Sequence, residues 1–94
     1  MANINAAGVY TKDKAGFEFL GNPNGAQAMV FSGSTLATTV EVGFLKTKGD
    51  TGTFQPFADG AITALPSDKY IDAVTDQLAI NVSGGSPDFD VDGV

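Results

Sequence analysis

The chain of 94 residues is the size of one domain, carries a net charge of −6 and contains neither cysteine nor histidine. Disulfides, zinc sites, iron–sulfur sites, thiol nucleophiles and imidazole bases are therefore excluded, which predicts a protein that is not an enzyme and has no cofactor. The 11 acidic residues outnumber the five lysines, and arginine is absent, so we expect no nucleic-acid binding. A charged content of only 17 % is low for an isolated domain and indicates that partners cover part of the surface.

The N-terminal stretch MANINAAGVY has neither a basic start nor an apolar run, which argues against a signal peptide or a membrane anchor. Its first part, residues 1–8, is uncharged, and Ile4 is its one core-forming residue. The segment is expected to be an arm that lies along a neighbouring subunit, a plain first strand or a frayed end. For the arm, the interface candidates are Ala2, Asn3, Ile4 and Asn5.

Glycines and prolines at short intervals separate runs rich in Val, Ile, Thr, Phe and Tyr, which is typical of an all-β protein. The clearest strands are 38–45 and 78–82, where apolar residues alternate with more polar ones. Shorter strands are expected at 15–20, 28–32, 53–57 and 60–64, for a total of about eight. The two alternating stripes predict six buried side chains: Val40, Val42, Phe44, Leu78, Ile80 and Val82.

Clusters of turn-forming residues lie between these runs, at 21–25, 48–52, 58–60 and 83–87. Asp50 and Asp59 precede or neighbour glycines there, and we interpret them as turn residues rather than metal ligands. The segment after Pro66 is less clear, because Ser67 can cap a helix that would place Ile71, Val74 and Leu78 on one face. A strand is favoured there, since a short isolated helix is marginal in water and strands surround the segment.

The C-terminal stretch SPDFDVDGV, residues 86–94, matches the opening of a calcium loop, with Asp88, Asp90 and Asp92 as weak candidate ligands. Such a loop needs a closing glutamate about six residues beyond Gly93, a position that the sequence does not include. The alternatives are a loose tail or a last edge strand, with Phe89 and Val91 turned inward and the aspartates outward. We favour the strand and expect no metal.

Two further pairs of residues are candidates for a catalytic or binding role. Glu18 and Glu41, the only glutamates, can be considered as an acid/base pair for glycoside hydrolysis, but a domain of this size offers little cleft for a sugar. Phe54 and Phe57 flank Gln55-Pro56 and are expected either to fill the core or to form an exposed aromatic anchor for a partner.

The stretches MANINAAGVYTKDKAGFEFLG, TTVEVGFLKTKGDTGTFQPFADGAITALP and LAINVSGGSP, taken together, resemble small virion proteins of tailed bacteriophages. The resemblance covers nearly the whole chain. The resemblance lies in the order of the segments and in short similar stretches, and not in a catalytic motif. Proteins of this type are β-sandwich decoration or cement subunits. The resemblance implies a partner, the phage major capsid protein, and a homo-oligomer, with a trimer favoured.

These observations predict a single antiparallel β-sandwich over residues 1–94, with about eight strands in a jelly-roll or immunoglobulin-like layout. The expected function is structural: a capsid decoration protein, made in the host cytoplasm, that cements the outer surface of the virion. The alternative is a small adhesion or carbohydrate-binding module on a tail, a fibre or a cell surface.

Overall fold

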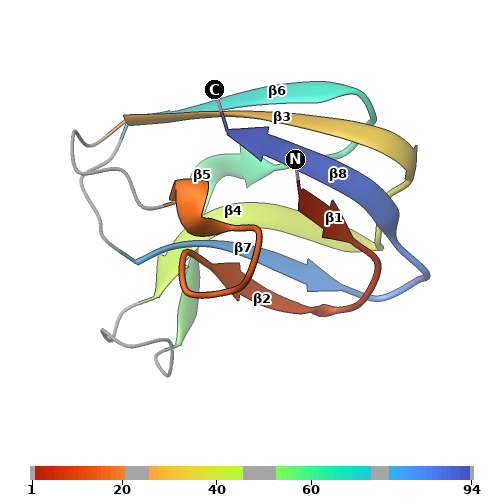
Figure 1. Cartoon of the computed structure of the whole chain (residues 1–94), viewed down its shortest axis with the longest axis horizontal. Coiled ribbons are helices and arrows are strands. Elements are labelled where there is room, and N and C mark those ends of the chain that lie inside the picture. The colour runs from red at the N-terminus through yellow and green to blue at the C-terminus, as the bar shows by residue number, and fades with distance from the viewer. Residues whose placement is uncertain (1, 21–25, 46–52, 73–76, 94) are drawn as a thin grey trace.

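The computed structural model describes residues 2–20, 26–45, 53–72 and 77–93, and Figure 1 shows their arrangement as two facing layers of strands. Sheet A has the strand order β1-β8-β3-β6, and sheet B has the order β2-β7-β4-β5. All described strand pairs are antiparallel. The strands are β1 (Ala2–Ile4), β2 (Gly8–Thr11), β3 (Ala26–Thr35), β4 (Thr39–Leu45), β5 (Phe54–Ala61), β6 (Ser67–Asp72), β7 (Leu78–Ser83) and β8 (Asp88–Gly93).

The strand pairing is nested from the ends of the chain toward its middle. Strand β1 pairs with β8, β2 with β7, β3 with β6, and β4 with β5, while the contacts β8–β3 and β7–β4 join these pairs into the two sheets. This is the order of a jelly roll, in which one long folded ribbon wraps into a double-layered sandwich. The predicted all-β sandwich of about eight strands is confirmed, and the order selects the jelly-roll layout over the immunoglobulin-like one.

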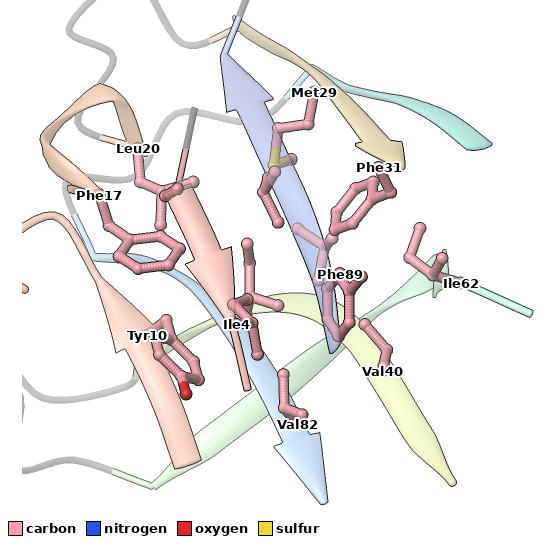
Figure 2. Close-up of a cluster of buried hydrophobic side chains, with 14 of the residues drawn as sticks. Ile4, Tyr10, Phe17, Leu20, Met29, Phe31, Val40, Ile62, Val82 and Phe89 are labelled. Carbon is pink, nitrogen blue, oxygen red and sulfur yellow. The ribbon is translucent and has the colours of Figure 1, made fainter. Parts of the chain in front are cut away.

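The core lies between the sheets, where the alternate residues of each strand meet. Figure 2 shows Phe31 and Phe89 together at its centre, and their ring centroids are 6.3 Å apart. Ile4 from β1 and Ile80 from β7 are fully buried. Removing a side chain of this size from water stabilises a fold by about 1.5–3 kcal/mol, so a few such residues account for much of the stability of a small domain.

Five of the six side chains predicted to be buried are confirmed, and the exception is Phe44. The buried ones are Val40, Val42, Leu78, Ile80 and Val82. Phe44 is half-buried, lies one residue before the end of β4, and packs its ring 5.4 Å from that of Phe57.

The prediction of a strand at 15–20 is wrong. After a turn that follows β2, residues Glu18–Leu20 form the short 3₁₀ helix η1, whose backbone bond runs from the amide of Leu20 to the carbonyl of Phe17. Phe17 and Leu20 are both buried. Their spacing of three residues is that of one 3₁₀ turn, so the apolar pattern here has a period of three rather than two.

The prediction of two strands at 53–57 and 60–64, with a turn at 58–60, is also wrong. One strand, β5, runs through Asp59 and Gly60, while its register against β4 shifts between Glu41 and Gly43. A β-carbon on Gly60 would collide with the backbone of Val42. The glycine therefore permits close backbone approach at a bulge instead of forming a hairpin turn.

The strand interpretation after Pro66 is confirmed, since Ser67–Asp72 forms β6 and Leu78–Ser83 forms β7. The turn at 83–87 is confirmed as well, with Gly84 and Gly85 at φ values of 78° and 71°. Val74, Asp50 and the predicted turns at 21–25 and 48–52 lie outside the described residues.

Both ends of the described chain lie in strands of sheet A. Segment 86–94 contains the last strand, β8, with Phe89 and Val91 buried, which confirms the strand interpretation. Its expected position at an edge is wrong, because β8 lies between β1 and β3, and β1 is the edge strand. Within segment 1–8, Ala2–Ile4 forms β1 in the chain's own sheet, as expected for a plain first strand.

Candidate functional site

The interface candidates near the N-terminus divide between the core and the surface. Ala2 and Ile4 are buried in the chain's own core, whereas Asn3 and Asn5 are exposed. The Asn3 amide faces β8, where its Nδ2 lies 2.9 Å from an Asp90 carboxylate oxygen and 3.3 Å from one of Asp88. Asn3 thus ties β1 to β8 through side chains, and a role of these residues in a subunit interface stays a prediction.

The aromatic candidates Phe54 and Phe57 are both half-buried. The Phe54 ring lies over Gly43, where an added β-carbon would come within 2.7 Å of it. Phe57 packs partly against the core and pairs with Phe44. Both rings therefore contribute to packing within the chain, and their use as anchors for a partner is a prediction.

The outer side of sheet A carries most of the acidic residues that the structure describes. Because Phe89 and Val91 point into the core, the period of two turns Asp88, Asp90 and Asp92 outward. In β6 Ile71 points into the core, so the residues that alternate with it, Asp68, Tyr70 and Asp72, point outward. We call this outer side of sheet A the acidic face; its residues are Asn3, Ala28, Val30, Ser32, Asp68, Tyr70, Asp72, Asp88, Asp90 and Asp92.

The strand register fixes how these side chains neighbour one another. Val30 lies opposite Asp92 on one side and Asp68 on the other, so the two carboxylates are about 10 Å apart across two strand spacings. Ala28 pairs with Tyr70 in the next outward row. Aspartates thus flank Val30 on both neighbouring strands, and the small residue Ala28 is the partner of Tyr70 on β3.

Tyr70 is the most exposed large hydrophobic residue in the described part of the chain. Its side chain is 62 % exposed, compared with 36 % for Val9, the other exposed residue of this class there. Asp68 and Asp72 stand two residues away on either side, about 7 Å along the strand. We did not single out Tyr70 from the sequence; the alternation of Asp68, Tyr70 and Asp72 around buried Ile71 was the signal that was missed.

The outer side of sheet B has a different chemistry. Glu41 of β4 lies there, and Asn81 Nδ2 donates to a Glu41 carboxylate oxygen at 3.2 Å. Leu45 and Ala79 are buried on this side although they lie outside the core cluster. Glu18, the other glutamate, is exposed on η1, and the absence of enzymatic activity stays a prediction.

No group of three or more carboxylates converges to hold a metal ion among the described residues. Asp88, Asp90 and Asp92 occupy successive outward positions of extended β8 rather than a loop that wraps a cation. That the protein needs no calcium stays a prediction. No helix in the described ranges is long and apolar enough to cross a membrane.

The described lysines lie away from the acidic face. Lys69 belongs to β6, but it points toward the inner side and donates from Nζ to the backbone carbonyl of Asp59, 2.6 Å away in β5. Lys12 and Lys14 lie in the turn after β2. The acidic face therefore has no basic side chain of its own among the described residues.

No family model matches the chain, and comparison with curated proteins and with solved structures gives no significant match.

Proposed function

We propose that the protein is a structural virion component that binds the outer surface of a phage capsid between major capsid protein subunits and stabilises the shell. The observation that carries this proposal is the division of the surface into two opposed sheet faces of different chemistry. One is the acidic face. On the other, the outer side of sheet B, Leu45 and Ala79 are buried and the Glu41 carboxylate accepts a hydrogen bond from Asn81. A subunit with two unlike faces suits a layer that contacts a shell on one side and solvent on the other.

The dimensions of the molecule support an extended contact. Its principal extents are 30 × 26 × 25 Å, so one broad side offers roughly the 800 Å² that each partner contributes to a standard protein interface. The sequence resemblance to decoration proteins points to the same role, and it also suggests a trimer. Closed threefold symmetry would satisfy the subunit contacts without open-ended growth.

The test is binding to purified capsids. Recombinant protein should co-sediment with tail-less capsids of the phage that encodes it, at a copy number proportional to the number of capsid subunits. Quantitative mass spectrometry of whole virions should then find hundreds of copies per particle. A few copies per virion, with no binding to tail-less capsids, would support a tail or fibre adhesion module instead. Complete absence from purified virions would overturn both roles.

A further inference from the structure

Tyr70 is an exposed aromatic ring on edge strand β6 of the acidic face, whose described charged residues are all aspartates. We propose that the acidic face docks onto a basic surface of a partner protein, with Tyr70 as the anchor for an arginine or lysine side chain. Such docking requires only a partner with a basic surface, whether or not that partner is a capsid.

The two tyrosines of the chain differ in whether their rings are already occupied. Tyr10 is 7 % exposed, its hydroxyl donates to the Ala6 carbonyl at 2.6 Å, and Lys14 Nζ lies 4.8 Å from its ring centroid. Tyr70 has no comparable ring or cation contact among the described residues. The face of the Tyr70 ring is thus available for a cation from outside the chain, at a distance where cation–π attraction is favourable.

The charges around Tyr70 favour a cationic partner over other occupants. Asp68 and Asp72 flank the ring on β6, and Asp92 lies across Val30 from Asp68. An incoming guanidinium or ammonium group can stack on the ring while its N–H groups donate to a neighbouring carboxylate. The same face of a second copy would bring like charges together, which disfavours self-association through this surface.

The centre of the proposed contact lies at β6 rather than at β8. Asp88 and Asp90 already accept hydrogen bonds from Asn3. Asp68 and Asp72 are exposed and have no such bond within the described residues. β6 is also an edge strand, so a partner can reach both its outer side and its rim.

The test is a titration of the isotope-labelled, full-length protein with a synthetic peptide of alternating arginine and glycine, followed by amide chemical shifts. A peptide of alternating glutamate and glycine is the control. We expect the arginine peptide to shift amides of β6 and of the adjoining part of β3, with an affinity that falls as salt is added. The glutamate peptide should shift none of them.

Matched variants separate the proposed site from general charge attraction. Asp68→Asn combined with Asp72→Asn should weaken peptide binding about tenfold, since each exposed ion pair is worth up to about 1 kcal/mol. Asp13→Asn combined with Glu18→Gln removes the same charge from exposed positions outside the face and should change the affinity by less than about twofold.

Substitutions of the ring test its role as an anchor. Tyr70→Phe keeps the aromatic ring and should preserve binding, whereas Tyr70→Leu should weaken it about threefold, the expected size of an exposed cation–π contact. Melting curves confirm that each variant is folded. Equal weakening by both double variants, or equal affinity of the Leu and Phe variants, would overturn the proposal. It would also fail if sedimentation showed that the free protein self-associates through Tyr70.

Discussion

Individual residues mark where this sandwich tolerates no additional atoms. At Gly43 a β-carbon would lie 2.7 Å from the Phe54 ring and 2.7 Å from Cα of Pro56, and at Gly33 it would lie 2.8 Å from Cα of Phe89. Both glycines sit inside strands, where the entropy of glycine ordinarily disfavours it. The close approach of a neighbouring strand or ring explains their presence better than a turn does.

Truncating two side chains of the predicted apolar stripes should have unequal effects. Ile80→Ala is expected to lower the free energy of unfolding by about 2–5 kcal/mol, because the side chain is fully buried. Phe44→Ala should cost clearly less, because Phe44 is half-buried and contacts Phe57 rather than the core cluster. Urea denaturation of both variants measures the difference. An equal or larger loss for Phe44→Ala would show that this ring belongs to the core.

At the scale of elements, the alternation of apolar and polar residues correctly predicted strands that turn one side toward the core and the other side away from it. Val40 and Val42 in β4, Ile80 and Val82 in β7, and Phe89 in β8 all follow it. It failed where local geometry replaced the period of two, as at the 3₁₀ turn η1 and at the bulged strand β5. Strand order depends on contacts between distant parts of the chain, so the interior position of β8 could not be read from its sequence.

The same limit applies to the candidate site. The outward aspartates of β8 were predicted from their alternation with Phe89 and Val91. Their position on one face with Asp68, Tyr70 and Asp72 was not predicted. The reason is that β6 and β8 become neighbours of β3 only through the jelly-roll order. The acidic face is therefore a property of the topology as much as of the local sequence.

Strand β1 is expected to be necessary for stability, although it has only three residues. Its Ile4 is fully buried in the core, so Ile4→Ala should lower the free energy of unfolding by about 2–5 kcal/mol. Deletion of residues 2–7 should destabilise the sandwich at least as much, in contrast to what a detachable arm would do. Thermal melting by circular dichroism measures both, with Asn5→Ala at an exposed position as the control. A deletion variant that melts like the full chain would restore the arm interpretation.

Strand β8 should be insensitive to calcium. Its three aspartates lie at alternate positions of an extended strand, and Asn3 already binds two of them. Addition of calcium or of a chelator should leave the melting temperature unchanged. A calcium-dependent rise that disappears in the Asp90→Asn variant would instead show that the strand contributes to a metal site.

At the scale of the whole molecule, charge is distributed unevenly. Of the nine acidic residues in the described ranges, five are the aspartates of the acidic face. Aspartates on neighbouring strands repel one another more in the folded sheet than in an extended, unfolded chain. The resulting strain on the native state is electrostatic and can be screened by salt.

Stability should therefore rise when moderate salt is added. Between about 10 mM and about 100 mM sodium chloride the screening length falls from about 30 Å to about 10 Å, comparable to the spacing between alternate strands. We expect a rise of about 2–5 °C in melting temperature, the equivalent of a fraction of a kcal/mol for a domain of this size. The Asp68→Asn, Asp72→Asn double variant should melt higher at low salt and respond less. If salt raises the melting temperature of the double variant as much as that of the natural sequence, the repulsion does not come from Asp68 and Asp72.

The nested pairing of strands also favours one order of folding. The pair β4–β5 closes the shortest loop, and each pair outward from it closes a longer one, until Ala2 meets Val91. Loop-closure entropy grows with length, so the inner pairs are favoured first and β1–β8 last. During synthesis β1 cannot pair until β8 has left the ribosome. Until then Ile4 lacks the neighbouring strand beside which it is buried. A circular permutant that links residues 2 and 93 through a short spacer would convert this slowest pairing into a local hairpin, and its refolding should be faster than that of the natural order.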